Sequence, residues 1–462
     1  MKNMTLSAIA EAVQGELHIA REEDTQKEAT CVVLDSRLIE AGGIFVATKG
    51  ERVDGHTFIP QVMERGALAA ICEDAPDDSY SYILVKDSFI ALKQLAKYYR
   101  AQLDVKVVGI IGSVGKTSTK EIVSSVLSEK YSVLKTQGNF NNEVGVPLTI
   151  CRIRDEHQIA VVEMGISDFG EMSRLADIAC PDAVVMTNIG PCHLENLGDL
   201  DGVLKAKTEV FNYMKDGSPV VLNKDDTKLG GHVDTGNLKV LYYGTNSQYY
   251  ADKIINLGLK GTSFEIHAAG KIANTQINLP GIHMVTNALA AAAIADELGL
   301  TIDEIAAGIE KAQGLSGRSN LIETENCLLI DDCYNANPKS MKSAIDLMRD
   351  AIGRKVAILG DMFELGINEK ELHAEIGEYA VTNGIDLLIC VGCLSENMYN
   401  AAVNKRTETD SDTIIQYYEK KEDLLNVLKE NSRSILLKDD TVLIKASHGM
   451  GFAEIVEYLS KN

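Results

Sequence analysis

The chain has 462 residues with a formal net charge of −22, and 45% of its residues are hydrophobic and 24% charged. This negative balance excludes nucleic acid and an anionic membrane surface as expected partners, because neutralising them requires a broad basic surface. We expect two or three domains from the length, no membrane insertion, and a cytoplasmic location, since nine scattered cysteines suit a reducing compartment.

The first predicted unit covers residues 1–86. Residues 6–15 are typical of a short amphipathic helix, and strand-like segments follow at 31–37 and 42–50. Polar turns hold Asp35-Ser36-Arg37 and Asp54-Gly55-His56. Turns of this kind can carry binding groups, although an ion pair within each turn is the simpler explanation of these residues alone.

The second predicted unit, residues 87–313, begins with a helix over 88–103 and contains a phosphate-binding loop. A buried strand at 107–111 runs into a glycine-rich loop, and Ser118 is expected to begin a helix. Lys116 would reach the outer phosphates of a nucleoside triphosphate, and the Thr117 hydroxyl would bind Mg²⁺. The spacing is the shorter G-x-x-G-K-T, because Ile110 occupies the usual first glycine position. The predicted nucleotide-binding residues are Gly112, Ser113, Val114, Gly115, Lys116, Thr117 and Ser118.

Alternating strands and helices follow, which predicts a parallel sheet with its ligand at the carboxyl ends of the strands. The strands are expected at 159–165, 183–190 and 219–223. Glu163 ends the first of them, where it could hold Mg²⁺ or cap the next helix. His193 lies a few residues beyond the second strand, and it is either a surface histidine or part of the same site.

Three further features of this unit remain open from the residues alone. The loop at 136–147 contains three asparagines, including Asn142, and either places amides over a phosphate or forms a series of asparagine turns. Lys205 and Lys207 lie on a predicted helix, where an ordinary ion pair explains them. Asn287 either caps an alanine-rich helix or presents its amide to a purine edge.

The third predicted unit, residues 314–462, has another doubly wound α/β pattern. Its strands are expected at 327–332, 355–362, 386–392 and 441–447. Arg318 and Asp332 lie in its first segments, and domain closure could bring them over the nucleotide. Cys390 and Cys393 form a C-x-x-C pair that is better explained by a buried strand than by a zinc site.

Together these segments resemble the Mur ligases, which build peptidoglycan precursors. The resemblance covers nearly the whole chain, and the segment DDCYNANP favours the branch that adds D-Ala-D-Ala. The matching segments are GSVGKTSTKE (112–121), TQGNFNNEVGVP (136–147), VVEMG (161–165), TNIGPCHLENLG (187–198), AKTEVF (206–211), GIHMVTNALAAAA (281–293), GRSN (317–320), DDCYNANPKSM (331–341), LGDMFELG (359–366) and LHAEIGEYA (372–380).

The resemblance implies an α/β protein of three domains and an ATP-dependent amide ligation. The domains would be a small UDP-sugar domain (1–86), a central parallel-sheet ATPase domain (87–313) and a Rossmann-like domain (314–462) that receives the dipeptide. ATP would phosphorylate the terminal carboxylate of UDP-N-acetylmuramoyl tripeptide, and the amine of D-Ala-D-Ala would attack the acyl phosphate. These two molecules would be the partners of an enzyme that we expect to be monomeric.

The resemblance also assigns roles to residues. The implied catalytic residues are Lys116, Asn142, Glu163, His193 and Lys207. Thr117 and Glu163 would bind one Mg²⁺, and His193 a second one supported by a carbamate on Lys207. Asn287 would contact adenine, with Arg318 and Asp332 on the phosphates and ribose. Substrate contacts would come from Ser36 and Arg37 for the UDP-sugar, and from Asn335, Ala336 and Asn337 for the dipeptide.

Two departures and two alternatives accompany this interpretation. Met284 stands where the family more often has asparagine, and Ala446 and His448 stand where glycine and arginine are more usual. One alternative is another amide ligase of the same superfamily, such as a folylpolyglutamate synthetase. The other is a catalytically silent nucleotide-binding relative, which would be expected to lack the phosphate and metal residues.

Overall fold

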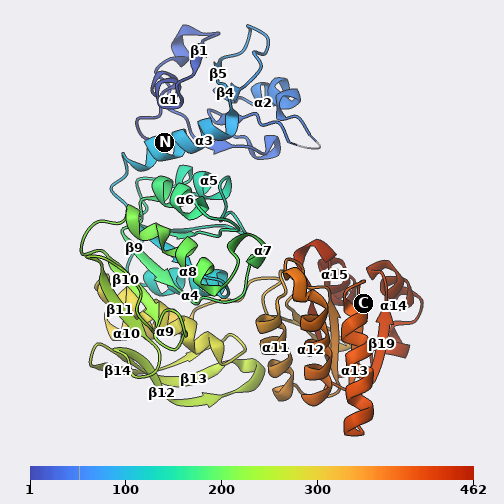
Figure 1. Cartoon of the computed structure of the whole chain (residues 1–462). Helices are drawn as coiled ribbons and strands as arrows, with labels where there is room; N and C mark the ends of the chain where they lie inside the picture. Colours follow the sequence, from blue (N-terminus) through green and yellow to red (C-terminus); the bar gives the residue numbers. More distant parts are fainter. Residues whose placement is uncertain (51–52, 462) are drawn as a thin grey trace.

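The structure, a computed structural model, describes residues 1–50 and 53–461 and contains three β-sheets that follow one another along the chain (Figure 1). Each sheet combines with helices into an α/β unit, which confirms the predicted fold class. In the described part of the chain, no helix is both long and apolar enough to span a membrane.

The N-terminal sheet has five short strands in the order β1-β5-β4-β3-β2, and only the β1–β5 pair is antiparallel. The strand expected at 31–37 shortens to two residues, because Asp35 accepts a hydrogen bond from the Arg37 backbone and starts a 3₁₀ turn. The strands are Glu16–His18 (β1), Val32–Val33 (β2), Ile44–Val46 (β3), Ala69–Cys72 (β4) and Tyr82–Leu84 (β5), with helices Leu6–Val13 (α1) and Ile59–Glu64 (α2).

The central sheet has nine strands in the order β14-β13-β12-β11-β10-β9-β6-β8-β7. Helix α3 (Ser88–Arg100) leads into it. The strands are Lys106–Ile111 (β6), Val133–Lys135 (β7), Ile159–Glu163 (β8), Ala183–Met186 (β9), Pro219–Asn223 (β10), Lys239–Tyr243 (β11), Tyr249–Asn256 (β12), Thr262–Ala268 (β13) and Lys271–Ile277 (β14). The helices are Lys116–Leu127 (α4), Gly145–Cys151 (α5), Glu171–Ala179 (α6), Leu194–Leu197 (α7), Leu200–Thr208 (α8), His283–Glu297 (α9) and Ile302–Glu310 (α10).

This sheet is parallel from β7 to β12, as predicted, but β12, β13 and β14 extend it with antiparallel pairs. In β13, buried and half-buried residues alternate strictly, which is the pattern of a strand with one packed face. The side chains of Phe264 and Ile266 belong to the same core as helix α9. In the turn after β12, Leu259 packs against the core of the C-terminal unit.

The C-terminal sheet has six strands in the order β15-β16-β20-β17-β18-β19, with β15 antiparallel and the rest parallel. The strands are Asn320–Glu323 (β15), Cys327–Asp331 (β16), Lys355–Gly360 (β17), Leu387–Val391 (β18), Ile414–Tyr418 (β19) and Asp440–Lys445 (β20). The helices are Pro338–Leu347 (α11), Glu369–Thr382 (α12), Ser395–Thr409 (α13), Lys421–Ile435 (α14) and Ala453–Lys461 (α15). Cys390 is buried within β18, whereas Cys393 is exposed.

The position of β6 between β8 and β9 determines where a ligand can bind. Ile110 pairs with Glu163 of β8, and Ile111 pairs with Met186 of β9. The three strands are parallel, so their carboxyl ends meet at one edge of the sheet. The phosphate loop, Glu163 and the segment that carries His193 therefore converge there.

Candidate active site

A cavity of about 1020 Å³ lies between the central and C-terminal units, at the carboxyl ends of β6, β8 and β9. Both units contribute polar side chains to its wall. The predicted site residues that line it are Ser113, Val114, Gly115, Lys116, Thr117, Ser118, Asn142, Glu163, His193, Asn287, Arg318, Asp332, Asn335 and Asn337.

The phosphate loop has the predicted strand–loop–helix form, but its helix α4 begins at Lys116, two residues earlier than expected. Gly112 has a φ of +146°, and a Cβ there would lie 2.0 Å from Thr187 Oγ1, so this position requires glycine. Lys116 Nζ donates to the Gly112 and Ser113 carbonyls at 2.9 and 3.2 Å. Burial lowers the pKa of Lys116. The loop thus places a desolvated cation beside the positive end of a helix, which favours an anion.

Glu163 ends β8 at the cavity wall and is only 1% exposed. Its Oε1 accepts hydrogen bonds from Thr117 Oγ1 at 3.2 Å and from Asn141 Nδ2 at 2.8 Å. The next helix, α6, begins at Glu171 after Gly170, so Glu163 is not a helix cap. The carboxylate and the hydroxyl supply oxygen ligands of the kind that suits Mg²⁺, and the Asn141 amide donates to the same carboxylate oxygen.

In the loop at 136–147, two neighbouring asparagines make different contacts. Asn142 lines the cavity, but its Oδ1 accepts from the backbone N–H groups of Val144 and Gly145 at 3.1 and 2.9 Å and so caps the start of α5. Asn141, which the sequence analysis did not single out, is the residue that reaches Glu163. Composition could not separate them, because both are asparagines in the same polar loop.

His193 lies just before α7 and contacts the C-terminal unit, with Nδ1 3.0 Å from Glu364 Oε2, a contact that becomes an ion pair only when the imidazole is protonated. Burial is the main influence on its pKa and lowers it. Glu364 follows β17 and has a φ of +62°. A contact between side chains 171 positions apart could not be expected from the sequence.

Two lysines on α8 have different environments. Lys207 is 1% exposed, and burial, with a smaller contribution from the Lys116 charge, lowers its pKa to about 8. Lys205 is exposed, and its Nζ lies 5.9 Å from the centre of the Phe169 ring. The structure therefore separates a desolvated amine from an ordinary surface lysine, and no ion pair of Lys207 occurs among the described residues.

Asn287 lies in the second turn of α9, which excludes the helix-cap interpretation, since Ile282 precedes the first helical residue. Its side chain faces the phosphate loop, where a Cβ on Gly115 would be 3.5 Å from Asn287 Oδ1. Asn287 Nδ2 lies 3.6 Å from the sulfur of Met284. Met284 thus supplies a weak acceptor next to the predicted adenine contact.

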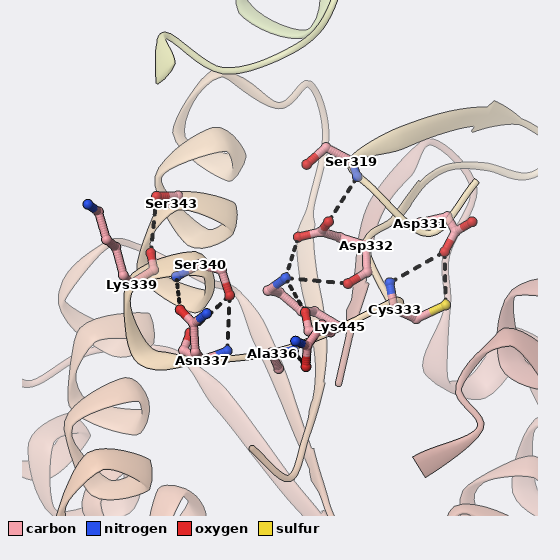
Figure 2. A network of polar contacts seen from close by, with 11 residues as sticks. Ser319, Asp331, Asp332, Cys333, Ala336, Asn337, Lys339, Ser340, Ser343 and Lys445 are labelled. Atoms are coloured by element: carbon pink, nitrogen blue, oxygen red, sulfur yellow. Dashed lines mark hydrogen bonds and ion pairs between the residues drawn. The ribbon is translucent and has the colours of Figure 1, made fainter. Parts of the chain in front are cut away.

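Polar residues of the C-terminal unit form the other wall of the cavity, and Figure 2 shows Asp332 between Ser319 and Lys445. Asp332 binds Lys445 at 2.6 Å and accepts from the Ser319 N–H at 2.9 Å. The Arg318 guanidinium lies 4.1 Å from the centre of the Tyr334 ring. Tyr334 and Lys445 were not predicted, although a lysine in the apolar strand 441–447 was a signal of a buried charge.

Other predicted substrate residues have different environments. Ala336 is 3% exposed and its side chain packs in the C-terminal core, between Asn335 and Asn337, which line the cavity. Asn337 caps α11 through the Ser340 N–H. In the N-terminal unit, Arg37 pairs with Asp35 at 2.6 Å, and the Ser36 carbonyl accepts from an arginine. The ion pair expected within this turn is present.

Three family models match successive parts of the chain: the Mur ligase family catalytic domain at residues 28–105, the Mur ligase middle domain at 110–295 and the Mur ligase glutamate ligase domain at 317–448. Together they cover most of the chain, including both walls of the cavity. The chain belongs to the Mur ligase family.

Relatives that match the full length of the chain indicate which Mur ligases it resembles. The UDP-N-acetylmuramoyl-tripeptide–D-alanyl-D-alanine ligase of Bacillus subtilis (strain 168) is 38% identical over 99% of both chains, and that of Escherichia coli (strain K12) is 34% identical over 100% of this chain and 99% of its own. A crystal structure of MurF from Acinetobacter baumannii has a TM-score of 0.87 at 31% identity over 99% of both chains. MurF ligase from Thermotoga maritima in complex with ADP has a TM-score of 0.79 at 30% identity, over 93% of this chain and 97% of that one.

The Mycobacterium tuberculosis folylpolyglutamate synthase shares the fold alone, with a TM-score of 0.62 at 14% identity over 80% of this chain and 94% of its own.

Proposed function

We propose that this chain is an ATP-dependent amide ligase that joins D-Ala-D-Ala to UDP-N-acetylmuramoyl tripeptide. The observation that carries the proposal is similarity over the full length to ligases of that name. The product would be the UDP-linked pentapeptide precursor of peptidoglycan. The enzyme would be cytoplasmic and would work as a monomer.

The chemistry requires two successive transfers. A carboxylate is a poor acylating agent, so the γ-phosphoryl group of ATP first moves to a carboxylate oxygen of the tripeptide, and ADP is released. The dipeptide amine then attacks the carbonyl carbon, the C–O bond to phosphate breaks, and the amine loses a proton. Lys116 and the start of α4 stabilise the charge that develops on the phosphates.

Magnesium fits the residues at the end of β8. Thr117 and Glu163 would hold it, and Asn141 donates to the same carboxylate oxygen. When bound, Mg²⁺ neutralises charge on the phosphates and orients the transferred group. Glu163 provides the negative charge for this site, while Lys116 remains free to contact phosphate.

A second metal position would use His193 and a carbamate on Lys207. A lysine amine does not bind Mg²⁺, but its carbamate presents two oxygens and a negative charge. Carbamylation requires the neutral amine, and a pKa lowered to about 8 increases the neutral fraction at neutral pH. Burial also shields the carbamate from water.

The remaining predicted residues complete the substrate path. Asn287 would contact adenine, and Arg318 and Asp332 would contact phosphate and ribose from the C-terminal wall. Asn335 would face the dipeptide from the same wall. The UDP-sugar would bind the N-terminal unit at Ser36 and Arg37, in the turn after β2.

The test is phosphate release from ATP and Mg²⁺ by the purified protein with UDP-N-acetylmuramoyl tripeptide, with and without D-Ala-D-Ala. We expect release to require both substrates and the product to be heavier by the condensed dipeptide in mass spectrometry. Parallel assays use tripeptides that end in meso-diaminopimelate or L-lysine. ATP binding without release on either tripeptide would reject the proposal, and a folate with glutamate is the next pair to assay.

A further inference from the structure

Behind the metal-binding carboxylate lies a lysine that the mechanism does not use. Lys120 is 0% exposed, and its Nζ is 3.7 Å from Glu163 Oε2 and 3.1 Å from Glu121 Oε1. Neither Lys120 Nζ nor Glu163 Oε2 has a hydrogen-bond partner within the described residues. A buried charge without hydrogen bonds is expensive to keep, so its position requires a reason.

The reason lies in the geometry of α4. Residues three and four apart lie on the same side of a helix, so Lys120 follows Thr117 and Lys116 by one turn. Lys116 lies beside the phosphate loop and Thr117 donates to Glu163 Oε1. Lys120 meets the other oxygen of the same carboxylate. One face of α4 thus carries the residues predicted to contact the phosphate and the metal, and also the lysine that lies next to the metal-binding carboxylate.

The two oxygens of Glu163 consequently have different surroundings. Oε1 accepts from Thr117 and Asn141, both of which line the cavity. Oε2 is buried and lies toward the Lys120 ammonium group. Terminal rotation of a carboxyl group is soft, and an attractive charge on one oxygen restricts it.

We propose that Lys120 is a positioning residue, which holds Glu163 Oε2 in the interior so that Oε1 is presented to Mg²⁺. This inference rests on the proposed function only for the identity of the metal site. Lys120 acts through Glu163 and does not touch substrate. Without its ammonium group, the carboxylate would be free to turn and would bind the metal less tightly.

The neighbouring charges supply a matched control. Glu121 is buried and also forms an ion pair with Lys135, whose side chain is 46% exposed. The charges therefore alternate from Glu163 through Lys120 and Glu121 to Lys135 at the surface. Lys135→Met removes a lysine from the same chain of charges without changing the groups next to Glu163.

The experiment measures Mn²⁺ binding to the full chain in the presence of ADP by electron paramagnetic resonance. For Lys120→Met we expect a Mn²⁺ dissociation constant raised at least tenfold, with metal-free ADP binding within about twofold of the unchanged protein. For Lys135→Met we expect both constants within about twofold. Mn²⁺ binding as tight in Lys120→Met as in the unchanged protein would overturn the proposal.

Two further variants separate positioning from folding. If Lys120→Met does not fold, the smaller neutral Lys120→Gln replaces it with the same expected loss. Combining the Lys120 change with Glu163→Gln should add less than twofold to the loss caused by Glu163→Gln alone, because Lys120 acts through that carboxylate. Independent, multiplicative losses would indicate a general structural role and reject the proposal. The assay contains no peptide substrate, so failure of the ligase proposal leaves its outcome unaffected.

Discussion

The charged side chains on the two walls of the cavity have different partners. On the central wall, Lys116 donates to carbonyls of its own loop and forms no ion pair among the described residues, while Glu163 Oε1 accepts from the cavity residues Thr117 and Asn141. On the C-terminal wall, Asp332 is paired with Lys445 and Arg318 is stacked on Tyr334. The central wall is therefore organised around charges that a nucleotide and a metal ion would balance, whereas the C-terminal wall is balanced by its own residues. A bound nucleotide and metal ion would balance the charges of the central wall. On the C-terminal wall, a ligand would have to compete with the existing contacts between side chains.

The largest expected effect comes from the central wall. Lys207→Met removes the amine that the proposed carbamate requires, and turnover should fall by roughly a thousandfold or more, because metal and electrostatic stabilisation dominates such transfers. The measurement is steady-state phosphate release. Lys205→Met on the exposed side of the same helix is the control and should stay within about twofold.

Rescue distinguishes the carbamate from a structural lysine. Added bicarbonate should not restore Lys207→Met or Lys207→Ala, because no amine remains to react. Short carboxylic acids should restore part of the activity by supplying an anion in the space. Full activity of either variant without any addition would reject the carbamate on Lys207. The central wall would then not need a bound anion at this position.

A substitution on the C-terminal wall should lower the free energy of unfolding. Lys445→Met leaves the Asp332 carboxylate without its cation, and loss of one partner of a buried pair costs about 3 kcal/mol. Urea unfolding followed by circular dichroism should show the C-terminal transition at lower urea. The double variant Asp332→Asn with Lys445→Met should recover much of the loss, and equal stability of all the variants would show that the pair is not what balances this wall.

A smaller effect should separate the neighbouring asparagines. Asn141→Ala removes a donor to Glu163 Oε1 and should raise the Mg²⁺ concentration for half-maximal activity about tenfold, equivalent to about 1.4 kcal/mol. Asn142→Ala removes the cap of α5 and should cost about 1 kcal/mol of stability. Activity titrations with Mg²⁺ and thermal unfolding test both. A reversed pattern would assign the metal contact to Asn142.

The smallest effect is expected where the walls touch. Glu364→Gln neutralises the partner of His193, but the Glu364 side chain is 68% exposed and such pairs contribute under about 1 kcal/mol. Thermal unfolding should change little. Since the change would weaken a contact between the two units, small-angle scattering of the ligand-free protein should show an equal or larger radius of gyration; a smaller radius would contradict the role of this contact as a link.

The sequence predicted the parts of the fold and site that are local. The phosphate loop is readable because strand, glycines, lysine and threonine occur within 12 residues of one another, and burial of residues 107–111 follows from their composition. It could not show which of Asn141 and Asn142 faces Glu163, because that depends on the loop backbone. Nor could it pair Asp332 with Lys445, which lie 113 positions apart and meet only when β16 and β20 are neighbours.

The antiparallel extension of the central sheet was missed for a related reason. In β13, buried and half-buried residues alternate, whereas most residues of β12 and β14 are exposed or half-buried. Buried parallel strands are recognised in a sequence by continuous apolar runs such as 159–163. A half-exposed antiparallel strand has no such run. The extension matters because its turn contacts the C-terminal unit through Leu259.

That contact gives the arrangement of the two units a temperature dependence. Separating them would expose the Leu259 side chain and the apolar surface it covers, and hydrating apolar surface raises the heat capacity. The free energy that holds the units together at this point would weaken on cooling, because hydrophobic association weakens in the cold. We therefore expect the spacing of the two walls to depend on temperature through Leu259, which is not among the residues that line the cavity.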